Sequence, residues 1–227
     1  MDDQAPGAWI GPARCEILGS PSEDFAKGGN FMAKRRIARN MGSADRAEVA
    51  RQNVLTSNQE KALLAIAPMA SANGFFLAGG TALAMQIHHR RSRDFDFFSP
   101  SKFDDPTQFV QSIQSAGINF TVNRIARGTV FGSVDGVEIS FLEYLYPVIN
   151  PTIKAPEYPV DLVDPIDIAA MKINAIIQRG MLRDFIDVYA LLKSGVSIQD
   201  MINAYRKKYS VENIRSILVA LNYFDDA

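Results

Sequence analysis

The segment FLAGGTALAMQIHHRRSRDFDFF, residues 76–98, carries the most specific pattern in the chain. A short apolar run reaches Gly79, Gly80 and Thr81, and a helix is predicted from Thr81 to His89. Glycine has no Cβ, so the backbone N–H groups of this turn can approach an anion at the N-terminus of the helix. The Thr81 hydroxyl can bind a phosphate or cap the helix. The pattern therefore predicts a phosphate-binding strand–turn–helix unit, although a simple tight turn would give the same sequence.

Two aspartates follow on a strand predicted for residues 94–98. Side chains alternate along a strand, so Asp94 and Asp96 should share one face, with Cα atoms about 6.5–7 Å apart. Mg²⁺ typically binds one or two carboxylates together with substrate phosphates, and two such ions can hold both oxygens of a phosphoryl transfer. Pairing of Asp94 with a neighbouring arginine is the structural alternative. The glycine turn and the aspartates together favour a metal-dependent phosphoryl-transfer site.

The glycine turn followed by Asp-x-Asp resembles the signature of the DNA polymerase beta-like nucleotidyltransferase superfamily. With His89, Arg90, Ser92 and the DFDFF motif, the segment is more closely similar to the AbiEii/AbiGii toxin family, the toxin half of type IV abortive-infection systems. The similarity covers roughly residues 57–195. It implies a minimal nucleotidyltransferase fold, Mg²⁺ as the cofactor, an NTP as the donor and a cognate antitoxin as a partner. It also makes tRNA a candidate for the acceptor.

Basic side chains lie between the glycine turn and the aspartates. A triphosphate carries several negative charges, and guanidinium groups bind phosphates in bidentate fashion. His89 and Arg90 match the family pattern, whereas Arg91 and Arg93 are equally well explained as a solvated surface turn. We therefore expect His89 and Arg90 to contact the triphosphate.

The position of a third carboxylate departs from the family pattern. Polymerase beta-like enzymes usually take this residue from a later strand, here predicted over residues 137–143, and Ser140 occupies its place. Glu138 lies on the same face two residues earlier and could substitute for it. Glu138 could equally be an exposed strand residue, and one metal with another base could suffice. The departure also keeps open a catalytically degenerate nucleotidyltransferase-like module that binds a nucleotide or a partner protein.

A lysine on an apolar helix face marks a second group of candidate residues. A helix is predicted over residues 165–179, with Asp164 as its N-cap and Gly180 after its end. Helical spacing places Lys172 among isoleucine and alanine side chains, with Arg179 nearly in line. Burying an unpaired ammonium group is costly, so Lys172 is expected to have an anionic partner.

Two aspartates on the next predicted helix, residues 182–193, can supply that partner. Asp184 falls inside the apolar sector of this helix, and Asp187 lies at its edge. A buried Lys172–Asp184 ion pair is the structural explanation, and a lysine that lines a triphosphate site is the functional one. The family has a similar block, in which the lysine and an aspartate are regarded as active-site residues. The expected catalytic residues are Asp94, Asp96, Lys172, Asp184, Asp187 and Glu138. The expected NTP-binding residues are Gly79, Gly80, Thr81, His89, Arg90, Ser92, Lys172 and Arg179, and the expected metal ligands are Asp94 and Asp96.

The whole chain has 227 residues, of which 47% are hydrophobic and 22% charged, and its formal net charge is −1. This composition is ordinary for a soluble globular protein, and the near-neutral charge argues against a regulator that coats nucleic acid. The single cysteine excludes a disulfide framework and a multi-cysteine zinc site. No apolar run approaches the roughly 18 residues of a membrane span. Met1 is followed by two aspartates and not by a signal sequence, so a cytoplasmic protein is expected.

Three parts are predicted along the chain. Residues 1–56 form a poorly ordered or accessory leader with one short helix near 43–53, and its basic run at 34–39 could bind RNA phosphates or be a solvated tail. Residues 57–163 form a nucleotidyltransferase α/β domain, and residues 164–227 form a C-terminal helical subdomain. A cleft between two such parts is a common place for a ligand site.

The expected fold class is α+β, with a mixed sheet of about five strands flanked by helices and followed by the helical subdomain. Ser57 and Glu60 predict a capping box at the start of the first helix. Strands are predicted over 75–78, 94–98, 119–126, 129–134 and 137–143, and helices over 57–73, 81–89, 105–116, 165–179, 182–193, 197–208 and 211–223. The expected function is a Mg²⁺-dependent nucleotidyltransferase that transfers NMP from an NTP to an acceptor hydroxyl of tRNA or protein, as the toxin of a type IV toxin–antitoxin system.

Overall fold

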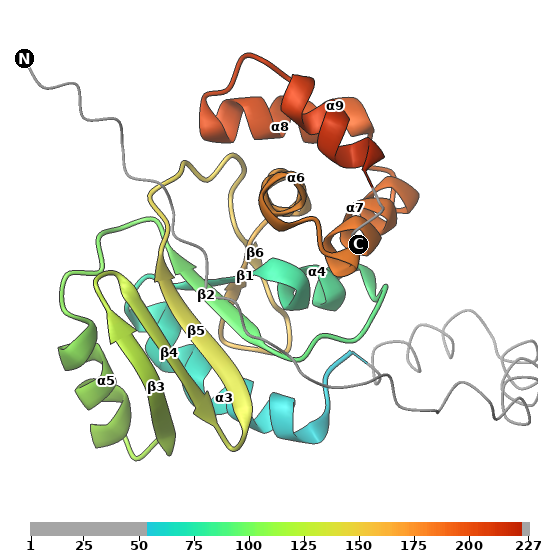
Figure 1. Ribbon diagram of the computed structural model, residues 1–227. Coiled ribbons are helices and arrows are strands. Elements are labelled where there is room, and N and C mark those ends of the chain that lie inside the picture. The colour runs from blue at the N-terminus through green and yellow to red at the C-terminus, as the bar shows by residue number, and fades with distance from the viewer. Residues whose placement is uncertain (1–53, 224–227) are drawn as a thin grey trace, which may run out of the picture. The chain divides into compact units, whose positions relative to one another are not determined.

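The structure, a computed structural model, describes residues 54–223 (Figure 1). The predictions for the leader, namely the short helix near 43–53 and the basic run at 34–39, lie outside the described residues. No helix within the described part of the chain is long and apolar enough to cross a membrane.

A mixed sheet lies at the centre of the described residues, with the strand order β3-β4-β5-β2-β1-β7-β6. β2 pairs with β5 in parallel and with β1 in antiparallel orientation, which places the Asp96 strand in the middle of the sheet. The strands are β1 (Phe76–Ala78), β2 (Phe95–Ser99), β3 (Phe120–Ala126), β4 (Thr129–Val134), β5 (Val137–Glu143), β6 (Ile153–Lys154) and β7 (Asp161–Leu162).

The expected mixed α/β fold is confirmed, but seven strands are present in the described residues in place of about five. The two additional strands, β6 and β7, have two residues each and lie between residues 143 and 165, where no strand was predicted. Proline has no N–H group to donate to a neighbouring strand. Pro151, Pro156 and Pro159 flank these strands and keep the pairing short.

Helices cover the sheet and build the second half of the chain (Figure 1). α3 and α5 contact the strands β3, β4 and β5, whereas α6 contacts α4, α7, α8 and α9. The helices of the described residues are α3 (Ser57–Ala72), α4 (Gly79–Ile87), α5 (Pro106–Ser115), α6 (Pro165–Arg179), α7 (Leu182–Lys193), α8 (Ile198–Tyr209) and α9 (Arg215–Asn222). The boundary predicted between residues 163 and 164 stays a prediction.

Aromatic side chains fill the core beneath the site. Phe95 and Phe97 of β2 are fully buried, and Phe97 stacks on Phe141 of β5 with ring centroids 5.1 Å apart. Because side chains alternate along a strand, this packing turns the intervening Asp96 to the opposite face. The apolar core therefore fixes the direction in which Asp96 points.

Three helix starts differ from the predictions. Thr56 and not Ser57 caps α3, because the Thr56 hydroxyl accepts a hydrogen bond from the Gln59 N–H and the Gln59 side chain accepts one from the Thr56 N–H. The capping box therefore uses Gln59 and not Glu60. α4 begins at Gly79, two residues before Thr81, and α9 begins at Arg215 and not at residue 211.

Candidate functional site

The first glycine of the turn makes room for a carboxylate. Gly79 has a φ of +67°, a backbone conformation that residues with a Cβ rarely adopt. A Cβ at this position would lie 2.6 Å from Oδ2 of Asp96. Glycine is therefore required both by the backbone conformation and by the closeness of Asp96 to the start of α4.

The second glycine makes room for a guanidinium group. A Cβ on Gly80 would overlap the guanidinium of Arg90. The sequence pattern predicted that both glycines leave space for an anion. In the structure the space above Gly80 holds a cationic side chain, which is itself able to bind a phosphate.

Thr81 fixes the strand that carries the aspartates. Its hydroxyl donates a hydrogen bond to the backbone carbonyl of Asp94, so the predicted capping role of Thr81 is wrong. The N-cap of α4 is Ala78, which makes no side-chain hydrogen bond to the helix. The first N–H groups of α4 therefore have no side-chain acceptor, and such a helix N-terminus attracts an anion.

Asp94 and Asp96 are brought together at this helix N-terminus. Asp94 directly precedes β2 and accepts a hydrogen bond from the Ser92 hydroxyl at 3.5 Å. Asp96 accepts one from the Ser140 hydroxyl at 2.6 Å. Burial and the charge of Asp94 raise the pKa of Asp96, against the opposing effects of Ser140 and Lys172. A carboxylate pair with this electrostatic strain favours a bound cation.

The third-carboxylate position is occupied by Ser140, as the sequence indicated. Ser140 is buried and lies opposite Asp96 in the register of β2 and β5. Glu138 lies two residues earlier on β5 and is exposed. Within residues 54–223 no group of three or more His, Cys, Asp and Glu side chains is arranged to hold a metal ion. Asp94 and Asp96 are thus a two-carboxylate site, which fits Mg²⁺ when substrate phosphates supply further oxygens.

Lys172 is buried between two aspartates of α7. Its Nζ lies 3.0 Å from Oδ1 of Asp184 and 2.7 Å from Oδ2 of Asp187. Both carboxylates are fully buried. The buried pair expected for Lys172 and Asp184 is present, and Asp187 completes it.

Two arginines and a histidine surround the two aspartates. Arg90 binds Asp187 through Nε at 2.6 Å and Nη2 at 2.9 Å, and the His89 Nε2 lies 2.7 Å from the same carboxylate. Arg179 binds Asp184 through Nε at 2.9 Å and Nη2 at 3.1 Å. Burial opposes ionisation, but the hydrogen bonds from Arg90 and His89 hold the pKa of Asp187 well below its usual range. Burial is likewise outweighed at Asp184, where Arg179 and Lys172 lower the pKa.

These contacts join all the predicted site residues except Glu138 into one neighbourhood. Lys172 and Arg179 also act electrostatically on Asp96, so the ionic network and the carboxylate pair are adjacent. The four aspartates face the three cations Lys172, Arg90 and Arg179. The site therefore has no large excess of positive charge, and a divalent cation would help it to hold a polyanionic triphosphate.

Some partners were not predicted from the sequence. The Gln59 side chain donates to the Ser92 carbonyl at 2.8 Å and so holds the loop before Asp94. Outside the site, Lys208 forms a buried ion pair with Asp167 at 2.7 Å. Both ion-paired residues lie on helix faces with apolar neighbours, the same signal that singled out Lys172.

Comparisons with known proteins place these features in a family. The sequence profile described as "Nucleotidyl transferase AbiEii toxin, Type IV TA system" matches residues 61–226. An uncharacterized protein from Aquifex aeolicus (strain VF5) is 35% identical over 176 residues, which cover 76% of this chain and 84% of the relative.

Three solved structures match this chain at low sequence identity. JHP933 from Helicobacter pylori is 15% identical, with 74% of this chain and 90% of that chain covered and a TM-score of 0.48. An antigenic nucleotidyltransferase-like protein from Paracoccidioides brasiliensis is 19% identical, with 73% and 94% covered and a TM-score of 0.42. The Megavirus polyadenylate synthase is 14% identical with a TM-score of 0.46, and the similarity covers 79% of this chain but only 40% of that one.

The profile match extends over well over half of the chain. It includes the glycine turn, both aspartates of the pair and the network around Lys172. The resemblance that the sequence motifs indicated is thereby confirmed. The chain belongs to the AbiEii family of nucleotidyl transferase toxins of type IV toxin–antitoxin systems.

Proposed function

We propose that the protein is a Mg²⁺-dependent nucleotidyltransferase that transfers NMP from an NTP to an acceptor hydroxyl. The observation that carries the proposal is the position of Asp94 and Asp96 beside the uncapped N-terminus of α4 and the buried Lys172. Anion-binding N–H groups, a carboxylate pair and a fixed cation are the elements that phosphoryl transfer requires.

Each group has a distinct role in the proposed reaction. Asp94 and Asp96 would hold Mg²⁺, which neutralises charge on the phosphates and orients them. The N–H groups at the start of α4 and the Arg90 guanidinium bind the β- and γ-phosphates. Asp184 and Asp187 hold the Lys172 ammonium group in one position, so its charge is already in place when the phosphates bind. The acceptor hydroxyl oxygen bonds to the α-phosphorus and releases its proton to solvent, the bond from that phosphorus to the bridging oxygen breaks, and pyrophosphate leaves.

The test is transfer of label from each α-³²P-labelled NTP to bulk tRNA by the full chain. Asp94→Asn should abolish transfer and leave the melting temperature close to that of the wild type, and chelation of Mg²⁺ should stop the wild type. Glu138→Gln is the matched carboxylate control on β5. Retained transfer in the Asp94 variant would refute the site, whereas loss in the Glu138 variant would identify the missing third carboxylate.

A degenerate module that binds a nucleotide without turnover is the second candidate. It is favoured by one observation, namely that the hydroxyl of Ser140 and not a carboxylate faces Asp96. Calorimetric titration with Mg²⁺–NTP, combined with an assay of pyrophosphate release, separates the two functions. Binding without release in the presence of tRNA would support the module.

We further propose that the protein acts as a toxin whose effect is countered by an antitoxin encoded beside it. The family description supports this role. Induced expression in a bacterial host should arrest growth for the wild type and not for Asp94→Asn. Co-expression of the neighbouring gene should restore growth. Equal growth arrest by the inactive variant would contradict the proposal.

A further inference from the structure

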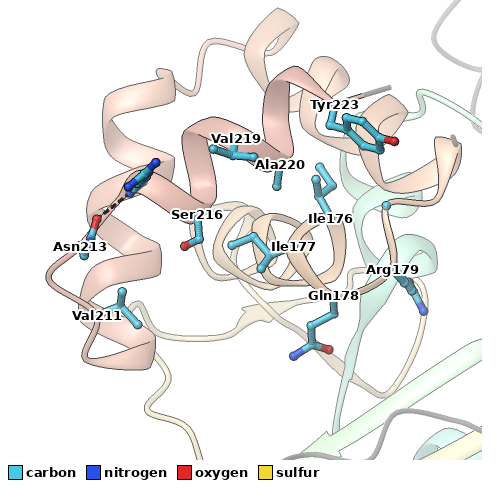
Figure 2. Close-up of a pocket in the computed structure, with 12 residues that line it drawn as sticks. Ile176, Ile177, Gln178, Arg179, Val211, Asn213, Ser216, Val219, Ala220 and Tyr223 are labelled. Atoms are coloured by element: carbon cyan, nitrogen blue, oxygen red, sulfur yellow. Dashed lines mark hydrogen bonds between the residues drawn. The ribbon is translucent and has the colours of Figure 1, made fainter. Parts of the chain in front are cut away.

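A cavity of about 860 Å³ lies between the last turn of α6 and the segment that contains α9. Its volume falls toward the upper end of the range of small-molecule sites. Figure 2 shows Ile176 and Ile177 of α6 on one side and Val219 and Ala220 of α9 on the other. None of the predicted site residues except Arg179 lines this cavity.

The lining combines an apolar surface with side chains that can form hydrogen bonds to the polar edge of a ligand. Tyr223 lies at one end, near Ile176, and supplies an aromatic ring (Figure 2). Gln178 and Asn213 supply amides, and Oδ1 of Asn213 accepts from the Arg215 N–H at 2.9 Å, so its NH₂ group remains for a ligand. Aromatic stacking together with amide hydrogen bonds is the usual way in which proteins hold an unpaired nucleobase.

The charges of the lining select an anionic ligand. The lining residues include no carboxylate and two arginines, Arg215 and Arg179, of which Arg179 is already paired with Asp184 behind the cavity wall. Glu212, which is adjacent in sequence to the lining residue Asn213, is itself paired with Arg206 at 2.5 Å. Arg215 is exposed and takes part in no ion pair within residues 54–223. A ligand with a base and more than one phosphate satisfies both the apolar wall and the arginines.

Arg179 connects the cavity to the carboxylate site. It lines the cavity and also holds Asp184, the partner of Lys172. A donor NTP would place its triphosphate at α4, with Arg90 and Lys172, and would have no phosphate left for Arg215. A strand with a phosphate at every nucleotide supplies one. The separate position of Arg215 therefore favours a polynucleotide over the donor.

We propose that the cavity between α6 and α9 binds one nucleotide of a single-stranded RNA that carries the acceptor hydroxyl. The base stacks on Tyr223 and on the isoleucine wall, and the flanking phosphates bind Arg215 and Arg179. This inference rests on the proposed nucleotidyl transfer for its purpose. The binding itself is measured without NTP or metal, so that failure of catalysis and failure of the cavity site are distinguishable.

The test is fluorescence anisotropy of the full chain with a short 5′-fluorescein-labelled single-stranded RNA. Tyr223→Ala should weaken binding by about 5- to 150-fold, the range for loss of one stacked base. Arg215→Ala should weaken binding and lower the slope of log affinity against log salt by about 1. Tyr189→Ala on α7 is the matched control, because Tyr189 is 59% exposed and Tyr223 55%. Arg124→Ala on β3 is the exposed arginine control.

Three results would overturn the proposal. The first is wild-type protein that does not bind the RNA. The second is RNA binding by Tyr223→Ala and Arg215→Ala that equals that of their controls. The third is unchanged RNA binding with weakened affinity for Mg²⁺–NTP, which would assign the cavity to the donor base.

Discussion

Replacement of Lys172 by methionine tests the ionic network as a structural and functional unit. Lys172 contacts two fully buried carboxylates, and breaking a buried ion pair from one side costs about 3–5 kcal/mol. After the replacement, Asp184 keeps Arg179, and Asp187 keeps Arg90 and His89. The loss in the free energy of unfolding should therefore lie near the lower end of this range, at about 3 kcal/mol. For a chain of this size that corresponds to a fall in melting temperature of about 6–12 °C.

Asp187→Asn should lower the free energy of unfolding more than Lys172→Met does, because three donors lose the negative charge of their shared carboxylate and one of its two acceptor oxygens. Lys172 retains Asp184, whereas Arg90 retains only the carbonyl of Arg91. The expected cost is about 5 kcal/mol. The double variant, Lys172→Met with Asp187→Asn, should lower the free energy of unfolding by less than the sum of the two single variants, with a coupling energy of about 0.5–3 kcal/mol.

The assay is thermal unfolding at neutral pH, followed by circular dichroism, together with NMP transfer by each variant. Lys193→Met, an exposed lysine at the end of the same helix α7, is the control and should change stability by less than about 0.5 kcal/mol. Lys172→Met should also abolish transfer. A melting temperature equal to that of the control, or a larger loss than for Asp187→Asn, would refute the network as the reason for the buried lysine.

Asp96→Asn should raise the melting temperature at neutral pH and abolish transfer, because burial and Asp94 raise the pKa of Asp96 in the folded chain. The gain should vanish below about pH 4, where this carboxyl is protonated in both states, and added Mg²⁺ should stabilise only the wild type. A variant no more stable than the wild type at pH 7 would contradict this reasoning. Gly80→Ala should lower stability by about 1–3 kcal/mol and slow transfer, because the added methyl overlaps the Arg90 guanidinium. Unchanged melting and transfer would place that guanidinium elsewhere. Lys208→Met should cost about 3–5 kcal/mol in chemical denaturation, since it leaves Asp167 buried without its cation, while transfer per folded molecule stays the same. A stability equal to that of the wild type would show that this ion pair is solvated.

Much of the fold follows from local periodicity. The helix over residues 165–179 was predicted with the bounds that α6 has, because its cap, proline and terminal glycine are local signals. The short strands β6 and β7 were not predicted, because two-residue strands show no side-chain alternation, and β7 pairs with Leu77 of β1, which lies far away in the sequence. The first capping box was also predicted one residue too late in the sequence. Thr56 with Gln59 and Ser57 with Glu60 have the same spacing, and only Gln59 has a distant partner in Ser92.

The site was predictable in its composition but not in its pairing. Lys172 and Asp184 stood out because charged residues lay on apolar helix faces, and the structure pairs them. The contact of Arg90 with Asp187 joins residues 97 positions apart, and no local pattern specifies it. The space above Gly80 depends on that contact, so the cation found there could not be derived from the glycine turn alone.

The bonds of Asp187 have a practical consequence for dividing the chain. This one carboxylate joins α7 to α6 through Lys172 and to the loop after α4 through His89 and Arg90. A fragment ending before α6 would retain the histidine and the arginine but lose the anion that orients them. We therefore expect separately expressed halves to be poor starting points for complementation, and a split-protein reporter would be better cut in an exposed loop such as the hairpin turn at Asp135 and Gly136.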